Sequence, residues 1–204
     1  MRYLTISLLF LGLSACSVLP TTKNLVGKIS QETINNPYFS NKKIDYVYKA
    51  KINAGNNNFG GLLILKKIKD KHHRVVFTTE FGNKIFDFEF INTKFKVNYI
   101  TNKLDKKFII NALKKDFQLL VNQYNISVLK FNAKKEFIYK TMLNNKNNYY
   151  VLSKENNTLI KIIMASKRKE KMTISFRDIE NNLSKNIELK HHNFNMTIEL
   201  NYIN

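Results

Sequence analysis

Apolar and polar side chains alternate along much of the chain after residue 44. In residues 84–91, for example, three phenylalanines fall on one side of an extended segment, while Asp87 and Glu89 fall on the other. Because neighbouring side chains of a strand point to opposite faces, a period of two predicts a strand with one buried face. Patterns of this kind predict strands, separated by short turns, at residues 45–52, 59–68, 74–79, 84–91 and 94–100. We expect these segments to form an antiparallel meander.

The period changes to that of a helix between Asp105 and Val121. Ile109, Leu113 and Phe117 recur at four-residue steps. The lysines of this segment and Asp116 lie elsewhere. This stripe predicts a single amphipathic helix of about four turns, with Asp105 as its N-cap. Strand patterns then return at residues 126–131, 136–143, 148–153, 158–165, 171–177, 186–190 and 194–202.

Taken together, these segments predict a mainly β (α+β) domain. The pattern gives about eleven strands, one long helix in the middle of the chain, and room for a short helix between residues 22 and 34. An antiparallel sheet of this length curls, because its right-handed twist accumulates from strand to strand. We therefore expect a half-open barrel with an apolar interior that the helices cover.

The first sixteen residues have the pattern of a bacterial lipoprotein signal. Arg2 precedes an apolar run of about ten residues, which is too short to span ~30 Å of hydrocarbon as a helix. The run ends in Leu13-Ser14-Ala15-Cys16, which resembles a lipobox, and Cys16 is the only cysteine. The resemblance implies cleavage after residue 15 and a diacylglycerol and an N-acyl group on Cys16, with no other cofactor. The alternative is an uncleaved apolar N-terminus with an incidental buried cysteine.

This signal divides the chain into three parts. Residues 1–15 would be removed, residues 16–44 would form a lipidated tether and lid segment, and residues 45–204 would form the half-barrel domain. Two or more fatty chains on one cysteine hold a protein stably on a membrane. The residue after the cysteine is Ser17 and not an acidic residue. By resemblance to the sorting rule of many two-membrane bacteria, this favours the outer membrane. We expect a lipid anchor there, with the domain on the periplasmic face.

The chain is strongly basic, with 34 Lys and Arg, 15 Asp and Glu, and a formal net charge of +19. Such a charge can indicate nucleic-acid binding. However, the Lys-Lys pairs fall in different predicted elements, and no recognisable nucleic-acid motif accompanies them. We therefore expect no nucleic-acid partner. Attraction to anionic head groups or lipopolysaccharide is one interpretation of the charge, and solvated lysine-rich faces are the other.

Signals for catalysis or metal binding are weak. Asp87 and Glu89 share a strand face at roughly 7 Å, a spacing that could serve general acid and base chemistry, but their lysine-rich surroundings favour a solvated outer face. Adjacent histidines at 72–73 and 191–192 point to opposite strand faces, which does not favour a metal site. The sequence shows no phosphate loop, nucleophile elbow or triad signature. We expect neither an enzyme nor a metal protein.

Three segments carry a family resemblance. Residues 74–83 resemble a strand, an apolar-Gly turn and a protruding loop, residues 104–121 a helical lid, and residues 183–189 the stretch before a last strand. Together they resemble the LolA/LolB superfamily, and the lipobox favours the LolB branch. The resemblance implies an outer-membrane lipoprotein that binds acyl chains of lipoproteins or lipids in an apolar cavity and delivers them to the outer membrane. The implied partners are lipoprotein cargo, a periplasmic LolA-like carrier and membrane lipids, with the protein itself a monomer.

By the same resemblance, Phe81 and Gly82 form a membrane-delivery loop at a hairpin tip, although Phe81 could instead pack back on the core. The expected cavity is lined by side chains from several strands and from the helix, namely Phe86, Phe88, Phe90, Val97, Ile109, Leu113, Phe117, Ile174, Phe176, Met196 and Ile198. The alternative for these residues is an ordinary packed core. The chain would then be an anchored structural subunit of an envelope complex with no working cavity. A lipid-handling hydrolase is the third hypothesis.

Overall fold

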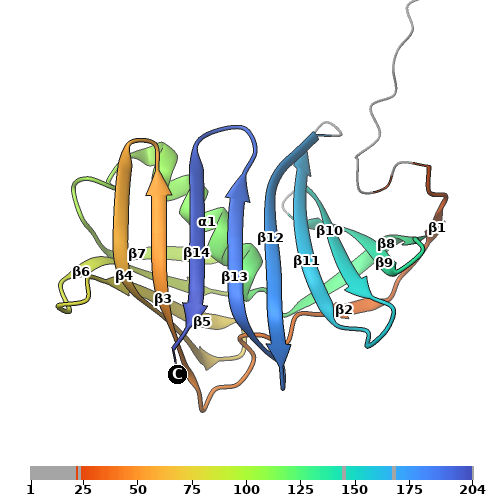
Figure 1. Ribbon diagram of the computed structural model, residues 1–204, viewed down its shortest axis with the longest axis horizontal. Helices are drawn as coiled ribbons and strands as arrows, with labels where there is room; N and C mark the ends of the chain where they lie inside the picture. Colours follow the sequence, from red (N-terminus) through yellow and green to blue (C-terminus); the bar gives the residue numbers. More distant parts are fainter. Residues whose placement is uncertain (1–21, 23, 144–145, 167–168, 204) are drawn as a thin grey trace, which may run out of the picture.

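The computed structural model describes residue 22 and residues 24–143, 146–166 and 169–203. Within them, one antiparallel sheet packs against one long helix (Figure 1). No helix of the described residues is long and apolar enough to cross a membrane. The signal peptide predicted at residues 1–15 and the lipid attachment predicted at Cys16 lie outside the described residues.

The described sheet has 14 strands, and each strand pairing is antiparallel. Its order is β1-β8-β9-β10-β11-β12-β13-β14-β3-β4-β5-β6-β7, and β2 also pairs with β8. The elements are β1 (Gly27–Ile29), β2 (Thr33–Asn35), β3 (Asp45–Ala54), β4 (Asn57–Lys69), β5 (His72–Thr78), β6 (Lys84–Ile91), β7 (Lys94–Ile100), α1 (Lys107–Val121), β8 (Tyr124–Asn132), β9 (Glu136–Leu143), β10 (Lys146–Ser153), β11 (Leu159–Ser166), β12 (Lys169–Glu180), β13 (Leu183–His191) and β14 (Met196–Tyr202).

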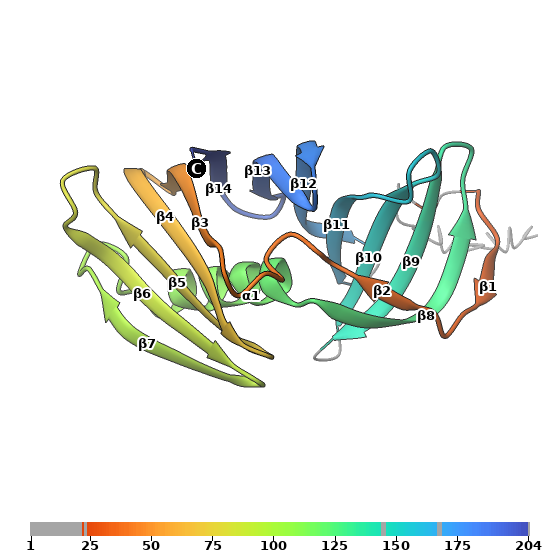
Figure 2. The same ribbon diagram turned by 90° about the horizontal axis from the view of Figure 1, so that it is seen from below.

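The sheet curls into an open half-barrel around α1 (Figure 2). Strands β3 to β7 form one limb, β8 to β11 with β1 form the other limb, and β12 to β14 join the two. The edge strands β1 and β7 stand at opposite ends of the strand order, so the described barrel is not closed. This confirms the predicted class, a mainly β open barrel with one long helix. The strand number is 14 rather than about eleven.

The short helix expected between residues 22 and 34 is wrong. Strands β1 and β2, of three residues each, lie there and pair one after the other along the edge of β8. Backbone hydrogen bonds from Ser30 N to Val128 O (3.2 Å) and from Ser127 N to Glu32 O (2.9 Å) hold the bend between them. A strand edge offers unpaired backbone groups to a nearby extended segment, which explains the outcome. Part of the segment expected to be a tether and lid therefore belongs to the sheet.

Helix α1 lies inside the half-barrel and packs against its concave face. The helix follows Lys106 as N-cap, so the prediction of Asp105 as N-cap is wrong. Asp105 instead belongs to the preceding turn, where its N–H donates to Thr101 O (3.0 Å). Phe117 is fully buried, and its ring centroid lies 5.7 Å from that of Phe86. Burying a side chain of this size contributes about 1.5–3 kcal/mol, so the helix is an integral part of the core.

A buried hydrogen bond between His191 and Asp116 joins the helix to the middle of the sheet. His191 Nε2 on β13 lies 2.8 Å from Asp116 Oδ2 on α1, and both side chains are buried. Burial raises the pKa of Asp116, and the hydrogen bond to His191 opposes that rise. Asp116 thus faces the sheet, whereas the sequence pattern placed it away from the apolar face of the helix.

A second, smaller apolar cluster lies on the opposite face of the limb formed by β8 to β11. Leu25, which precedes β1, packs against it. The buried members of this cluster are Phe131, Ile138, Tyr149, Val151, Ile163 and Ala165. Both faces of this limb are therefore apolar, which explains the uninterrupted apolar run in β10.

Candidate binding pocket

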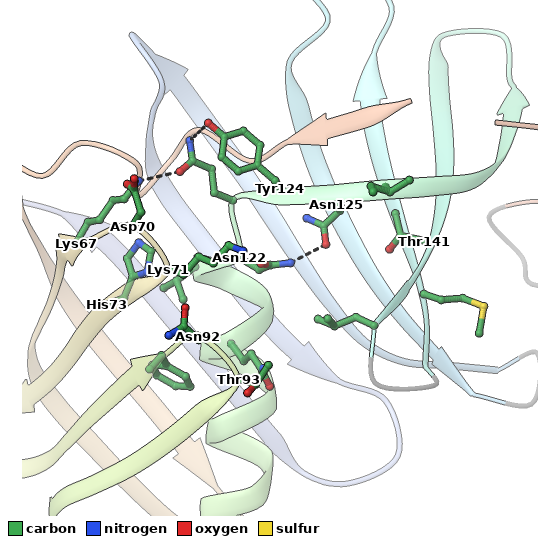
Figure 3. A pocket seen from close by; sticks show the side chains of 17 residues that line it. Lys67, Asp70, Lys71, His73, Asn92, Thr93, Asn122, Tyr124, Asn125 and Thr141 are labelled. Atoms are coloured by element: carbon green, nitrogen blue, oxygen red, sulfur yellow. Dashed lines mark hydrogen bonds and ion pairs between the residues drawn. The ribbon is translucent and has the colours of Figure 1, made fainter. Parts of the chain in front are cut away.

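A pocket of about 640 Å³ opens between the two limbs, at the C-terminal end of α1 (Figure 3). One side is formed by the β4–β5 and β6–β7 turns, and the other side by β8 and β9. The end of α1 and residues 122–123 lie between these walls. Pockets of ~300–1,000 Å³ are typical of small-molecule sites, so this space suits one ligand of modest size.

Much of the pocket surface is apolar. Phe90 and Val121 contribute from β6 and α1, and Ile126, Met142 and Leu143 contribute from the opposite wall. Ile126 is 67% exposed and Met142 is 59% exposed. Large apolar side chains that stay open to solvent beside a pocket are available to contact an apolar ligand.

The wall near the β4–β5 turn carries Lys67 and Asp70, which are paired, and Lys71, which makes no ion pair within the described residues. Lys67 Nζ donates to Gln123 Oε1 at 2.9 Å and lies 3.4 Å from Asp70 Oδ1. The pKa of Asp70 is lowered, mainly by its hydrogen bond with Lys42. His73 adds no charge near neutral pH, because burial lowers its pKa to about 4.

The opposite wall contains buried polar groups without charge. Asn122 Nδ2 donates to Asn125 Oδ1 at 2.7 Å, and both residues point into the space that Thr141 faces (Figure 3). Asn125 Nδ2 and Thr141 Oγ1 are buried and have no hydrogen-bond partner among the described residues. On the neighbouring strand β10, Tyr150 Oη also makes no hydrogen bond of normal geometry within the described part of the chain. Burial raises the pKa of Tyr150, and the nearby side chains of Asn122 and Asn125 oppose that rise. Buried polar atoms without partners are uncommon in native structures and require an explanation.

The structure places the residues expected to line a cavity mainly in the packed core. Ten of them are buried, and Phe86 and Phe88 stack with ring centroids 4.4 Å apart. Val97, on the edge strand β7, is 37% exposed. Phe90 is the member of this set that also lines the pocket. Since α1 occupies the concave face, a role for the others in lining an acyl cavity stays a prediction. The buried ten are Phe86, Phe88, Phe90, Ile109, Leu113, Phe117, Ile174, Phe176, Met196 and Ile198.

Sequence reasoning missed most of the pocket residues, including Asn125, Thr141 and Met142. A signal was present in β8, where Asn125 and Ser127 are buried while Ile126 between them is exposed. Such an inverted pattern, with polar residues inward and an apolar residue outward, marks a strand that does not simply face a dry core.

The hairpin loop between β5 and β6 projects Phe81 into solvent. Phe81 is 94% exposed, so the alternative that it packs on the core is wrong. Thr79 N donates to Asn83 O (2.8 Å), and Gly82 N donates to Thr79 O (3.0 Å), which closes the turn. Gly82 has φ +83°, a conformation that glycine adopts without strain. The β5–β6 turn lies at the opposite end of these strands from the turns that form the pocket.

The two carboxylates considered for acid and base chemistry are held in ion pairs. Arg74 binds Asp87 through two hydrogen bonds of 2.9 and 2.7 Å, and Lys84 Nζ adds a third at 2.9 Å. These contacts, that with Arg74 first, lower the pKa of Asp87. Glu89 Oε1 lies 2.6 Å from His72 Nε2. Both residues face away from the phenylalanines of β6, as expected, but Asp87 is buried beneath its partners rather than solvated.

Each of the four histidines contacts a different group. His72 binds Glu89, His73 Nε2 lies 3.1 Å from Phe39 O, His191 binds Asp116, and His192 contacts Thr173. Among the described residues, no group of three or more His, Cys, Asp and Glu could hold a metal ion.

Comparison with known proteins finds a likeness to solved structures. No protein-family model matches the chain, and no curated protein matches it. A solved structure with a similar arrangement is a domain from Vibrio parahaemolyticus, provisionally assigned as an outer membrane lipoprotein-sorting protein. The two chains are 10% identical, the TM-score is 0.44, and the match covers 78% of this chain and 83% of that one. A likeness of this degree carries no argument about function.

Proposed function

We propose that this chain is a LolB-like outer-membrane lipoprotein, anchored through lipids on Cys16, that binds acyl chains of lipoproteins or lipids and delivers them to the membrane. The observation that carries the proposal is the pocket of about 640 Å³ at the mouth of the half-barrel, with its exposed apolar wall. The lipobox-like segment ending at Cys16 supports the anchor.

Transport of acyl chains through water needs such an apolar surface. Exposing an acyl chain of ~16 carbons to water costs on the order of 10 kcal/mol of transfer free energy, at ~0.8 kcal/mol per CH₂. The apolar wall around Ile126 and Met142 can substitute for the bilayer over part of that chain. Unloading then requires that the membrane bind the chain more tightly than the pocket does, and no covalent step is needed.

The exposed loop gives the proposal a means of contacting the bilayer. Phe81 can enter the membrane interface and gain up to about 1.5–3 kcal/mol on full burial. The pocket and this loop lie at opposite ends of β5 and β6. Phe86 and Phe117 are in contact between the pocket and the loop. An acyl chain that moved from the pocket to the loop along the concave face would therefore pass beneath α1, and the helix would have to move.

A structural subunit without a working cavity remains the second candidate, because a specific observation favours it. The phenylalanines of the concave face contact one another, with centroid distances of 5.4 Å for Phe77 and Phe86 and 4.4 Å for Phe86 and Phe88. Interiors packed in this way have few voids, so a rigid helix would leave the pocket at the mouth as a surface feature.

The absence of tryptophan from the sequence allows a direct test. In the full chain, purified from membranes into nanodiscs, Met142→Trp places one fluorophore at the pocket. Palmitate brominated along its chain should quench this tryptophan at micromolar concentration. The matched control is Phe108→Trp, since Phe108 is equally exposed, at 59%, but lies at the other end of α1.

Two outcomes separate the candidates. Stronger and saturable quenching at position 142 than at position 108 supports acyl binding in the pocket. Equal, non-saturable quenching at both positions would mean that the probe only enters the bilayer, and the structural subunit would then be the better account.

A further inference from the structure

On the neutral wall of the pocket, two side chains each have a polar atom that makes no hydrogen bond to the described residues. Asn125 on β8 is 6% exposed and Thr141 on β9 is 1% exposed. Ser127, which pairs with Thr141 across the two strands, uses its hydroxyl on Ser30 and on Glu32 O. The oxygen of Asn125 is taken by Asn122. Three polar atoms of this region therefore have no hydrogen bond within the described residues: the donor Asn125 Nδ2, the hydroxyl Thr141 Oγ1 and, on β10, the hydroxyl Tyr150 Oη, which Asn125 approaches. Of these, Asn125 and Thr141 line the pocket.

We infer that Asn125 and Thr141 form a binding site for the neutral carbonyl group of an acyl amide or acyl ester. This inference rests on the proposed function and deepens it, because it names the part of the cargo that the protein recognises. The carbonyl oxygen accepts hydrogen bonds from Asn125 Nδ2 and Thr141 Oγ1, while the attached hydrocarbon lies against Ile126, Met142 and Leu143.

The charge around this wall favours a neutral group over an anion. Asn122, Asn125 and Thr141 are uncharged, and the C-terminal end of α1, which carries partial negative charge, reaches the pocket at Val121. Burying a carboxylate against neutral donors alone is unfavourable. On the far wall, Lys67 is engaged with Gln123 and Asp70. Lys71 also lines that wall, on the side of the pocket opposite Asn125 and Thr141.

Geometry also favours a ligand over a purely structural role. Backbone pairing between β8 and β9 shifts register between Ser127 and Leu129, next to the site, and Thr141 stays directly opposite Ser127. A strand pair that had only to close a core would place apolar side chains at Asn125 and Thr141, since unpartnered polar groups weaken a dry interior. Here the same positions border a pocket that is open to solvent.

Competition in the Met142→Trp chain, in nanodiscs, tests the inference. Four probes of similar chain length are to be compared as competitors of brominated palmitate: N-palmitoylglycine amide, monopalmitoylglycerol, palmitate and hexadecane. We expect the amide and the ester to compete best. Thr141→Val removes the hydroxyl at nearly constant volume and should weaken these two probes about tenfold, as for one lost hydrogen bond, while hexadecane changes less than twofold. Thr141→Ser keeps the hydroxyl and should restore affinity for both.

The relative affinities of the probes distinguish the sources of the carbonyl, and they separate failure of the carbonyl site from failure of the proposed function. Tighter binding of the amide identifies an N-acylated peptide as the preferred cargo, and tighter binding of the ester identifies a glycerolipid. The carbonyl site is wrong if palmitate binds best and Thr141→Val leaves its affinity unchanged, or if this substitution changes the affinity of all four probes equally. Water would then be the partner of Asn125 Nδ2 and Thr141 Oγ1. If no probe displaces the brominated chain, because that chain never quenched position 142, the proposed function itself fails. Should Thr141→Val not fold, Asn125→Leu applies the same discrimination.

Discussion

Helix α1 meets two different environments along its length. In its middle, Phe117 is fully buried against Phe86, and the surrounding side chains are apolar and in contact. At its C-terminal end the wall opposite contains Met142, which is exposed, and Thr141, which is buried without a partner among the described residues. The close apolar packing around the middle of the helix stabilises the fold, whereas an exposed apolar side chain and an unpartnered buried hydroxyl at its end do not. A ligand is therefore to be sought at the end of the helix rather than at the centre of the barrel.

The largest expected effect concerns the packed middle. Phe117→Ala should lower the free energy of unfolding by about 3–5 kcal/mol, because it removes a fully buried ring and leaves a cavity. Met142→Ala, at the open end, should lower it by less than about 1 kcal/mol, since that side chain is largely exposed. Urea unfolding of the two variants, followed by circular dichroism, measures both values.

Equal losses in these two variants would remove the contrast between the regions. An additional gain of acyl binding in Phe117→Ala would sharpen it, because the new cavity would join the space expected along the concave face. Stability and binding are then read on the same purified samples.

The next effect concerns the loop that projects from the limb of β3 to β7. Phe81→Glu should leave acyl binding unchanged, since Phe81 is 94% exposed and far along β5 from the pocket. It should slow delivery to liposomes about tenfold or more, because a charged side chain cannot gain the 1.5–3 kcal/mol of interfacial burial. Transfer of a fluorescent acylated peptide from the reconstituted full chain to acceptor liposomes measures this rate.

Phe81→Leu is the matched variant, and it should transfer at nearly the original rate. Unchanged delivery by Phe81→Glu would show that the exposed ring has no part in membrane contact, and the proposed mechanism would lose its delivery step.

The smallest effect concerns the buried hydrogen bond that joins Asp116 on α1 to His191 on β13. Burial raises the pKa of Asp116 above its ordinary value of 3.8, so the folded protein favours the neutral carboxyl. The stability that Asp116 contributes is full below pH 3.8 and is lost as the pH rises through the raised pKa. Asp116→Asn cannot ionise, so its free energy of unfolding should rise relative to that of the original chain as the pH increases from 4 to 8.

Urea midpoints of both proteins at pH 4, 6 and 8 test this difference. The comparison removes the contribution of His73, whose lowered pKa acts equally in both. A difference that stays constant over this range would show that Asp116 does not titrate with folding.

Periodicity was sufficient to predict the regular elements. Each strand from β3 to β14 overlaps a segment with a strand pattern, and the stripe through Ile109 and Leu113 predicted the helix correctly. It failed for β1 and β2, because three residues are too few to show a period and their pairing with β8 depends on a distant segment.

The candidate site was harder to predict for a physical reason. An apolar face looks the same in sequence whether a helix or a lipid covers it, so Phe86, Phe88 and Ile198 could not be assigned to a cavity or to a core. Asn125 and Thr141 come together only because β8 pairs with β9 beside the end of α1. The local pattern placed Phe81 at a hairpin tip, since glycine is common in tight turns, but it left open whether the ring is exposed or packs on the core.

The pairing of the N-terminal segment with β8 also limits how the molecule can lie. Thr22 follows Cys16 by six positions in the sequence, a distance of at most about 20 Å for a fully extended chain. Strand β1 and the loop between β5 and β6 stand at opposite ends of the long axis (Figure 2). If Cys16 carries the proposed lipids, this short segment and the exposed Phe81 can reach the same bilayer only when the long axis of the molecule runs along the membrane surface.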